Sequence, residues 1–461
     1  MNFKNGGVSF WYRDIGGLPK KFASLSSNVE ADVCIIGGGY TGLWTAYYLK
    51  KIQPELKVII LEKEFCGFGA SGRNGGWLTG GFAWDHSKYL ESSDERSVQL
   101  FVRRLLETVP EILDICQKND INADIASTSE VRVATNSAQV GRLKHELQTR
   151  KSWGVSEDRV SYIKGPALED IIQIPNAQGA LVMDGVARVQ PAKLVQGLRS
   201  LVNKLGVDIY EDTLVTDYES GVVSTSFHKV KSRIILRTTE GFSANFKTYA
   251  RDLLPLNSAQ IVTHPIDREI WSLIGWDKNE LIGDYAHSYF YAQRTREGRI
   301  ALGGRGVPYR FGSVTDENGI TQKNTIFALE KILYKHFPLV KEVGIDHAWC
   351  GTLGVPRDWC ASVNFNRETG VGWAGGYVGV GVSTSNLAGQ TLADLCLDRK
   401  TDNTKLPWIN RHTRKWETEP LRWFGVRGMH KLLEFGDARE EKNGTPSRAA
   451  HVANYIMGRS H

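Results

Sequence analysis

The sequence predicts two domains: an α/β domain with a doubly wound parallel sheet, and a second α+β domain built on a mixed or antiparallel sheet. Three observations lead to this expectation. The chain has 461 residues, enough for two domains of ordinary size. Its first sixty or so residues contain a strand, a glycine turn, a helix and another strand. Between about 255 and 349 the pattern changes to aromatic strands with one periodic helix, which is typical of α+β domains.

Each element of the α/β domain has its own signal. DVCII at 32–36 is an apolar run closed by glycines, and LWTAYYLKK after it has helical character. KVIILE at 57–62 predicts the second buried strand. A helix over 192–205 and the strand IILRTT at 234–239 indicate a return of the chain to this sheet. The segment VGWAGGYVGVGVSTSNLAGQTLADLCL then supplies a strand, a glycine turn and a helix.

The second domain is expected to interrupt the first. Apolar residues at three- and four-residue steps from Glu91 to about Asn119 predict a long amphipathic helix. VRVAT, GALVM, SYFYAQ and RIALGG have strand character, and residues 322–337 predict a helix. We therefore assign 1–90, 165–250 and 350–400 to the first domain, and 91–164 and 251–349 to the second. Residues 401–461 form an aromatic, charged extension that wraps the core as helices, contacts a partner subunit or is partly disordered.

Composition excludes several classes of protein. A net charge of +6 over this length is too small and scattered for nucleic-acid binding. Six cysteines lie far apart with no CxxC pair, so we expect no metal site and no disulfide framework, as suits a reducing compartment. The amino terminus lacks the apolar run of a signal peptide, and no apolar segment is long enough to span a bilayer. The expected location is cytoplasmic.

The segment GGGYTG carries the first chemical signal. Gly37, Gly39 and Gly42 fit GxGxxG, which makes a tight turn, lets backbone approach a pyrophosphate and lets the helix pack on the strand. The helix amino terminus then presents N–H groups to negative charge. Glu62 ends the next strand, where its carboxylate accepts hydrogen bonds from ribose hydroxyls and repels a 2′-phosphate. This order predicts dinucleotide binding and disfavours NADP.

The segment CGFGASGRNGGW at 66–77 carries the second signal. Its small residues let main chain run close beside a long ligand and offer N–H groups without side-chain bulk. It is not a phosphate loop of the GxxxxGK[ST] type, since no lysine precedes Ser71. It is not a plain linker either, because Arg73 and Asn74 set polar groups among the glycines. We expect extended backbone alongside the cofactor.

These motifs together resemble a known family. DVCIIGGGYTGL, LEKE and GFGASGRNGG, in this order, are similar to the D-amino-acid oxidase-type (DAO) FAD-dependent oxidoreductases, and within them to the γ-glutamylputrescine oxidoreductase-like group. The resemblance continues in GALVMDGVARVQPAKLV, GRIALGGRG and AGGYVGVGVSTSNLAG, and covers nearly the whole chain up to about residue 400. It implies a Rossmann-like FAD-binding domain of the glutathione-reductase/p-hydroxybenzoate-hydroxylase type and a second, substrate-binding domain.

The resemblance also implies which residues bind FAD. The pyrophosphate falls to Gly37, Gly39, Tyr40, Thr41 and Gly42, the adenosine ribose to Glu62 and Lys63, and the adenine to the backbone of Val215. The ribityl chain and the ring are lined by Gly69, Ala70, Ser71, Arg73, Asn74, Gly75, Gly76 and Trp77. Backbone donors at the far edge of the ring, where negative charge grows on reduction, come from Gly376, Tyr377, Gly379, Val380, Gly381 and Val382.

The family reaction is oxidation of a C–N bond: hydride passes from the carbon beside an amine to flavin N5, and the imine is hydrolysed. This needs a positioned, unprotonated amine more than a protein base, and no triad or carboxylate pair is evident. We expect an amine or amino-acid oxidase or dehydrogenase that uses O2 or another electron acceptor. The identity of the amine and the oligomeric state stay open. Alternatives are a flavin-binding assembly protein without turnover and a flavin monooxygenase.

Substrate contacts are expected from the second domain. Amino-acid oxidases of this family pair an arginine with the substrate carboxylate, and the candidates are Arg294, Arg305 and Arg357. Where glycine-oxidase-like members carry an arginine this chain has Leu353, which puts a simple α-amino-acid substrate in doubt. Tyr289, Tyr291, Tyr309 and Trp77 are candidates for the pocket wall. Although Cys66, Cys350 and Cys360 fall in segments near the cofactor, we predict non-covalent FAD.

Overall fold

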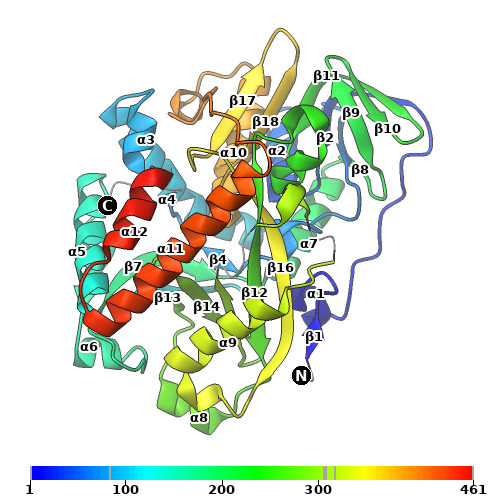
Figure 1. Cartoon of the computed structure of the whole chain (residues 1–461). Helices are drawn as coiled ribbons and strands as arrows, with labels where there is room; N and C mark the ends of the chain where they lie inside the picture. The colour runs from blue at the N-terminus through cyan, green and yellow to red at the C-terminus, as the bar shows by residue number, and fades with distance from the viewer. Residues whose placement is uncertain (1–2, 83–84, 305–308, 316–317, 459–461) are drawn as a thin grey trace.

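The computed structural model describes residues 3–82, 85–304, 309–315 and 318–458. Two β-sheets organise the chain, one in the upper right of Figure 1 and one in its lower half, with helices packed around both. The first sheet is mainly parallel and the second is mixed but mostly antiparallel. The predicted fold class, an α/β domain with a second α+β domain, is confirmed.

The first sheet has eight strands, and its centre is five parallel strands in the order β18-β11-β2-β3-β8. β17 pairs antiparallel with β18, and the β9–β10 hairpin joins the far end of β11. The strand bounds are β2 (Val29–Ile36), β3 (Val58–Leu61), β8 (Asp208–Tyr210), β9 (Val215–Glu219), β10 (Val222–Thr225), β11 (Lys229–Arg237), β17 (Ser362–Asn366) and β18 (Val371–Gly375).

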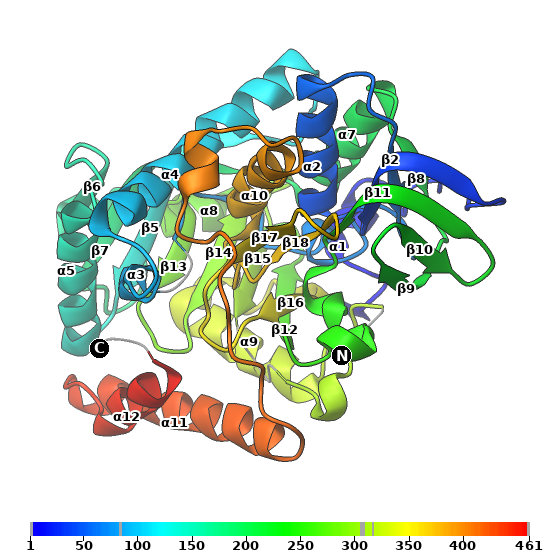
Figure 2. The ribbon, with the colours of Figure 1, turned by 90° about the horizontal axis from the view of Figure 1, so that it is seen from above.

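Four helices build the core beside this sheet. They are α2 (Tyr40–Ile52), α4 (Glu95–Lys118), α7 (Pro191–Lys204) and α10 (Gly381–Cys396). α2 packs against α7 and α10, and α10 packs against α4. Figure 2 shows α2, α4 and α10 gathered on one side of the molecule. Buried side chains of all four helices join those of β2 and β3 in one hydrophobic cluster. This packing fixes the turns that precede α2 and α10 relative to each other.

The second sheet has ten strands in the order β1-β16-β12-β15-β14-β13-β5-β7-β4, with β6 paired to β7. Their bounds are β1 (Lys4–Asn5), β4 (Trp77–Leu78), β5 (Ala126–Ala134), β6 (Val160–Ile163), β7 (Gly179–Arg188), β12 (Leu254–Thr263), β13 (Leu281–Asp284), β14 (Phe290–Arg294), β15 (Ile300–Gly304) and β16 (Ile345–Val355). Leu329 and Leu333 of α9 (Lys323–His336) pack with Ile261 and Leu302 on one face of this sheet. The other face receives the 66–77 segment, because Trp349 and Gln260 both donate hydrogen bonds to the Arg73 carbonyl.

Two elements pack with a different domain from the one to which the sequence assigned their segment. β7 lies within the 165–250 segment but pairs with β5 and β6 of the second sheet. α4 lies within 91–164 but packs into the core of the first domain. The domain boundaries themselves stay a prediction. The remaining helices are α1 (Phe10–Asp14), α3 (His86–Leu90), α5 (Ser137–Ser152), α6 (Pro166–Glu169) and α8 (Arg268–Ile274).

The extension is helical at its end. α11 (Leu421–Asn443) and α12 (Arg448–Met457) form an antiparallel pair on the outer surface, on the side away from α2 and α4 (Figure 2). Residues before α11 run along the core, with the Trp408 side chain fully buried and the Trp416 indole donating to the Val355 carbonyl. Among the described helices, none is long and apolar enough to cross a membrane.

Candidate cofactor and active site

A cavity of about 560 Å³ lies at the carboxyl ends of the parallel strands. Its walls come from the ends of β2, β3 and β11, the start of α2, the 66–77 segment, two residues of β16 and the turn before α10. The predicted residues that line it are Gly37, Gly39, Tyr40, Thr41, Glu62, Lys63, Gly69, Ala70, Ser71, Asn74, Val215, Tyr377, Gly379, Gly381 and Val382. Segments more than 300 positions apart in the chain thus meet at one cavity.

The first turn of α2 faces this cavity with backbone donors. Its N-cap is Gly39, the Ser71 hydroxyl accepts the Tyr40 N–H at 2.8 Å, and no acidic residue lies in its first turn. Gly37 adopts a φ of 107°, a conformation that favours glycine. A Cβ on Gly42 would lie 2.1 Å from the Gly37 carbonyl oxygen, so Gly42 serves helix–strand packing rather than the cavity wall. This geometry suits an anionic group at the helix start.

Glu62 projects from the end of β3 into the same cavity. Its carboxylate accepts hydrogen bonds from the backbone N–H groups of Gly38, at 2.7 Å, and Glu64, at 3.0 Å. Burial raises the pKa of Glu62 to about 6, with these two donors acting in the opposite direction. Glu62 is therefore ionised at neutral pH and can accept hydrogen bonds from ribose hydroxyls.

The 66–77 segment contributes backbone to the cavity and braces itself with its polar side chains. The Asn74 amide donates to the carbonyls of Ala70 and Ser71, and its oxygen accepts from the Gly76 N–H. The buried Arg73 guanidinium lies over the Phe68 ring and donates to the carbonyls of Phe68 and Cys350. Arg73 does not line the cavity, so we assign it to shaping the loop rather than to contact with the cofactor.

The end of this segment meets the second sheet. A Cβ on Gly75 would lie 2.5 Å from the Tyr291 ring, and one on Gly76 would lie 2.0 Å from the Gln293 amide nitrogen. The Trp77 ring packs edge-on to Tyr291, with ring centroids 6.1 Å apart. The predicted pair Trp77 and Tyr291 thus lies together where the loop meets the sheet.

The turn before α10 is tied to the start of α2. The Tyr377 hydroxyl lies 2.9 Å from the Thr41 hydroxyl oxygen. Gly379 and Gly381 line the cavity beside Val382, whereas Gly376 and Val380 do not. Gly376 instead donates its N–H to a carboxylate that the sequence analysis did not single out.

That carboxylate is Glu240, which follows β11 and lines the cavity. It accepts hydrogen bonds from the backbone N–H groups of Gly376 and Tyr377, at 3.2 Å each. Other cavity residues that the sequence analysis did not name as site residues include Thr213, Thr239, Phe242, Asn245, Phe246 and Thr352. Their common signal is position: most follow a strand of the parallel sheet at its ligand-binding edge.

The cavity fits FAD by its chemistry. Its glycine turn leaves room where a side chain would otherwise stand, and α2 presents N–H groups to a diphosphate. Glu62 supplies an acceptor for ribose hydroxyls, and Val215 and Leu214 add apolar wall next to it. Tyr377, Gly379, Gly381 and Val382 of the turn before α10 complete the wall. An elongated ligand with an anionic centre matches this order.

The predicted substrate arginines are placed elsewhere. Arg294 donates to the Trp276 carbonyl, pairs with Asp277 at 3.4 Å and lies over the Trp271 ring, 4.0 Å from its centroid. Arg357 pairs with Glu417 of the extension at 3.2 Å. Arg305 lies outside the described residues. Neither described arginine lines the cavity, whereas Leu353 does.

A different arginine lies beside the predicted aromatic pair. Arg132, Gly283, Tyr291 and Gly303 are successive partners across β5, β13, β14 and β15 and therefore share one face of the sheet. A Cβ on Gly283 would lie 3.3 Å from the Trp77 ring and 3.8 Å from Arg132 Cγ. The Arg132 side chain is 30% exposed and pairs with Glu130 at 2.5 Å. Arg132 thus borders the region between the second sheet and the 66–77 segment. Its guanidinium is already paired with the Glu130 carboxylate.

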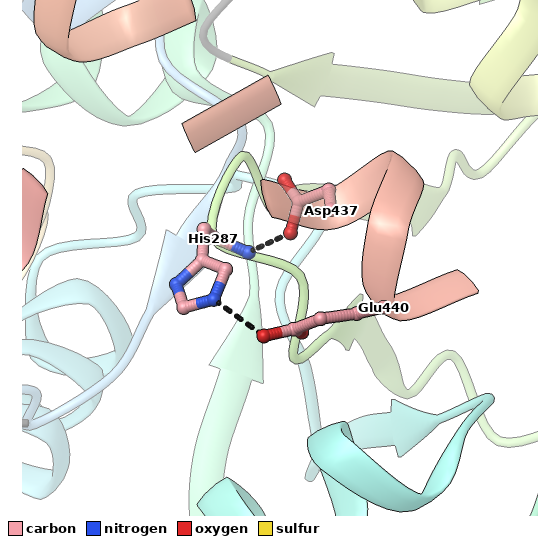
Figure 3. Close-up of side chains that lie close together, drawn as sticks. All are labelled: His287, Asp437 and Glu440. Carbon is pink, nitrogen blue, oxygen red and sulfur yellow. Dashed lines mark hydrogen bonds and ion pairs between the residues drawn. The ribbon is translucent and has the colours of Figure 1, made fainter. Parts of the chain in front are cut away.

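One group of metal-ligating side chains lies apart from the cavity. His287, Asp437 and Glu440 place ligand atoms within 4.8 Å of one another, the single such group among the described residues (Figure 3). Asp437 accepts the backbone N–H groups of His287 and Ser288, and Glu440 Oε1 lies 3.1 Å from His287 Nε2. Arg142 contacts both Glu440, at 2.8 Å, and His287 Nε2, at 3.1 Å. The Arg142 guanidinium already supplies the positive charge that a metal ion would bring to these side chains. We therefore interpret the group as a contact that joins α11 to the second domain.

Comparison with known proteins agrees with the geometry. The family model described as FAD dependent oxidoreductase matches residues 32–395. Gamma-glutamylputrescine oxidoreductase of Escherichia coli (strain K12) is 26% identical over 84% of this chain and 88% of its own. Glycine oxidase from Geobacillus kaustophilus superposes with a TM-score of 0.67 at 19% identity, covering 81% of this chain and 96% of that one. L-Amino acid deaminase from Proteus myxofaciens superposes with a TM-score of 0.68 at 15% sequence identity, and the match covers 85% of this chain and 95% of that one.

Proposed function

The chain belongs to the family of FAD-dependent oxidoreductases, and from this premise we propose that it oxidises a C–N bond of an amine or amino-acid-like substrate, whose imine product is then hydrolysed. The observation that carries the proposal is the single cavity shared by the glycine turn of α2, Glu62 and the turn before α10. FAD, when bound, accepts two electrons from the carbon–hydrogen bond next to the substrate nitrogen.

The chain's own residues hold and orient the reactants. We assign the diphosphate to the N–H groups that start α2, the adenosine ribose to Glu62 and the adenine to the wall at Val215. Ala70, Ser71 and Asn74, which line the cavity, would contact the middle of the bound cofactor. The N–H groups of Gly379, Gly381 and Val382, which line the cavity, would stabilise negative charge on a bound ring system, because they are fixed before the reaction begins.

The substrate is proposed to enter between the 66–77 segment and the second sheet. Trp77 and Tyr291 contact each other there, beside the residues that line the cavity, and the Tyr291 hydroxyl lies 3.0 Å from the Ser258 hydroxyl oxygen. Of the candidate arginines that the structure describes, Arg294 and Arg357 have partners elsewhere. Leu353, at the position where glycine-oxidase-like members carry an arginine, lines the cavity. We therefore favour an amine without a carboxylate on the carbon that is oxidised.

The test is anaerobic mixing of the holoenzyme with matched pairs of substrates. Each pair joins an amine to the α-amino acid that differs from it by one carboxylate, and loss of the yellow flavin absorbance is recorded. We expect the amine of a pair to reduce the flavin at least tenfold faster. Faster reduction by the amino acids would overturn the substrate class, and no reduction by any amine or amino acid would overturn the function.

The partner for reoxidation is proposed to be O2 or another small electron acceptor. Peroxide release, compared with reduction of an artificial acceptor by the same enzyme, distinguishes an oxidase from a dehydrogenase. A cytoplasmic location is proposed with it, and the cysteines support this, since all six are free thiols.

Non-covalent attachment of FAD is proposed as well. Cys66 is fully buried, and burial raises the pKa of its thiol well above the ordinary value. Burial also raises the pKa of Cys360 to about 12. Because the thiolate is the reactive form, these groups are poor nucleophiles. We expect acid precipitation to leave all flavin in the supernatant, and yellow colour on the precipitated protein would contradict this.

A further inference from the structure

Glu240 stands in an unusual backbone conformation for its type. Its φ is 46°, in the left-handed region that glycine and asparagine tolerate far better. It follows the last strand residue, Arg237, by three positions, at the edge of the parallel sheet where ligands bind. Such strain collects at functional sites, where surrounding structure maintains it.

The surrounding structure is built to receive this carboxylate. A Cβ on Gly354 of β16 would lie 2.3 Å from Glu240 Oε2, and one on Gly375 of β18 would lie 3.1 Å from it. The carboxylate accepts from the N–H groups of Gly376 and Tyr377, and the Tyr377 hydroxyl contacts Thr41 of α2. Glu240 therefore connects the turn before α10 with the helix that faces the diphosphate.

Within the described part of the chain, Arg237 is the one cationic side chain whose charge acts on Glu240. Arg237 is the last residue of β11, and its guanidinium donates to Tyr218 and Ser243 and lies between the Tyr249 and Trp373 rings. The turn before α10 contributes Tyr377 as its one titratable group, and β16 and β18 contribute glycines. Desolvation raises the pKa of Glu240 to about 7, against the two N–H donors and Arg237.

We propose that Glu240 holds a proton when FAD is bound, so that cofactor binding is coupled to proton uptake at this side chain. FAD would bring a diphosphate with negative charge into a cavity that Glu240 already lines, and its bulk would exclude solvent from that cavity. Both effects disfavour a second anion at this site. A neutral carboxyl keeps one oxygen as acceptor for the Gly376 and Tyr377 N–H groups and offers its O–H to the cavity.

The direction of the pH effect follows from this. If the bound state keeps the proton to a higher pH than the free state, FAD affinity falls as pH rises above about 7, by up to about tenfold per pH unit. Protonation of Glu62 has the opposite effect on FAD affinity and occurs at lower pH, because Glu62 accepts hydrogen bonds from the ribose hydroxyls as an anion. Measurements above pH 7 therefore isolate Glu240.

The experiment titrates apoprotein with FAD between pH 6.5 and 9 and follows quenching of flavin fluorescence. We expect the dissociation constant of the unsubstituted protein to rise by more than tenfold over this range. In Glu240→Gln it should change less than threefold. Asp252→Asn is the matched control, since Asp252 also interacts with Arg237 but does not line the cavity, and it should follow the unsubstituted protein.

Calorimetry in two buffers of different ionisation enthalpy gives a second readout. At pH 8 the unsubstituted protein should take up a measurable fraction of a proton per FAD, and Glu240→Gln should take up none. Glu240→Asn, which suits the left-handed conformation, replaces the glutamine variant if that apoprotein fails to fold. An equal pH dependence in unsubstituted and substituted proteins overturns the proposal. The inference rests on FAD binding alone. A failure of the protein to oxidise amines would leave the coupling of FAD binding to proton uptake intact, and absence of this coupling would leave amine oxidation intact.

Discussion

At the level of single residues, two carboxylates on one cavity wall have different environments. Glu62 has two backbone donors at hydrogen-bond distance and the end of a strand behind it, which favour an anion that recognises ribose. Glu240 has longer bonds and a cation that is engaged elsewhere. The same residue type thus serves two purposes, because local donors decide the charge.

Glu62 gives a direct prediction for cofactor affinity. Glu62→Gln replaces a charged acceptor with a neutral one, so the FAD dissociation constant should rise by about ten- to a hundredfold. The pKa of Glu62 lies near 6, above its ordinary value, so affinity in the unsubstituted protein should also fall as pH drops through 6. Fluorescence titration between pH 5 and 7 measures both. An unchanged constant in the variant would show that Glu62 does not contact the ribose.

Gly42 gives a prediction about packing. In Gly42→Ala the new methyl carbon would lie 2.1 Å from the Gly37 oxygen and 2.8 Å from the Thr238 hydroxyl oxygen, so we expect about 3 kcal/mol lower unfolding free energy. Gly141 of α5 is the matched control, because nothing lies within 4 Å of its Cβ position. Gly141→Ala should raise stability by about 0.5–1 kcal/mol. Denaturant unfolding tests both, and equal stability of the two variants would contradict the packing role.

The sequence identified some site residues better than others. GxGxxG and Glu62 were predictable because their spacing follows the turn, helix and strand that place them. Glu240 was not, since a glutamate in TTEG has the pattern of a surface turn and its left-handed φ is set by β16 and β18, far away in the chain. Arg294 was a candidate by its resemblance to the family's arginine position, but its partner Trp271 comes from a helix whose packing the sequence does not specify.

At the level of elements, the spacing of apolar residues predicted well whether a segment is a helix or a strand. It predicted poorly which other element that segment pairs with. The long helix expected from Glu91 to Asn119 is α4, and the strands at 32–36 and 57–62 are β2 and β3. β7 falls within the 165–250 segment that was assigned to the first domain, yet it is the neighbour of β5 in the second sheet. A buried strand has the same apolar pattern in either sheet, because only tertiary packing chooses the partner.

α11 is joined to the second domain by the cluster of Glu440, Arg142 and His287, and the free energy that this cluster contributes to docking of α11 can be measured. Glu440 is almost fully buried and bonds with Arg142, His287 and the Ser447 N–H. Glu440→Ala leaves these groups without their carboxylate, so docking of α11 should weaken by about 3 kcal/mol. Hydrogen exchange of α11 amides should rise accordingly. Glu441→Ala is the control, because its pair with Lys335 is exposed and should contribute little.

The same cluster has a defined response to acid. Hydrogen bonds from His287, Arg142 and Ser447 outweigh burial and lower the pKa of Glu440 to about 2. A depressed pKa stabilises the folded state above the ordinary value of about 4.5 and loses that contribution as pH falls toward 2. Exchange at α11 should therefore increase between pH 4.5 and 2.5 in the unsubstituted protein. A pH-independent exchange rate, after correction for intrinsic chemistry, would contradict the assignment.

At the level of the whole molecule, the extension has two parts with different roles. Residues 401–419 run along the core: Trp408 is fully buried in the main hydrophobic cluster, and Arg411 pairs with Asp358 at 3.0 Å. The α11–α12 pair has a small cluster of its own around Leu433, Ala450 and Ala453. The first part therefore belongs to the cofactor-binding core, and the second is attached from outside.

Truncation separates these roles. A chain that ends at Pro420 loses α11 and α12 but keeps Trp408 and Trp416, so we expect it to fold and bind one FAD with a lower melting temperature. A chain that ends at Lys400 opens the core that Trp408 fills and should lose FAD or become insoluble, since emptying a large aromatic site costs about 3–5 kcal/mol. Trp408→Ala in the full chain isolates that effect from the change in length. Flavin content per protein and thermal unfolding are the measurements. If the chain ending at Pro420 lost FAD as completely as the shorter one, the outer helices would have to support the cofactor site, and the division of the extension would be wrong.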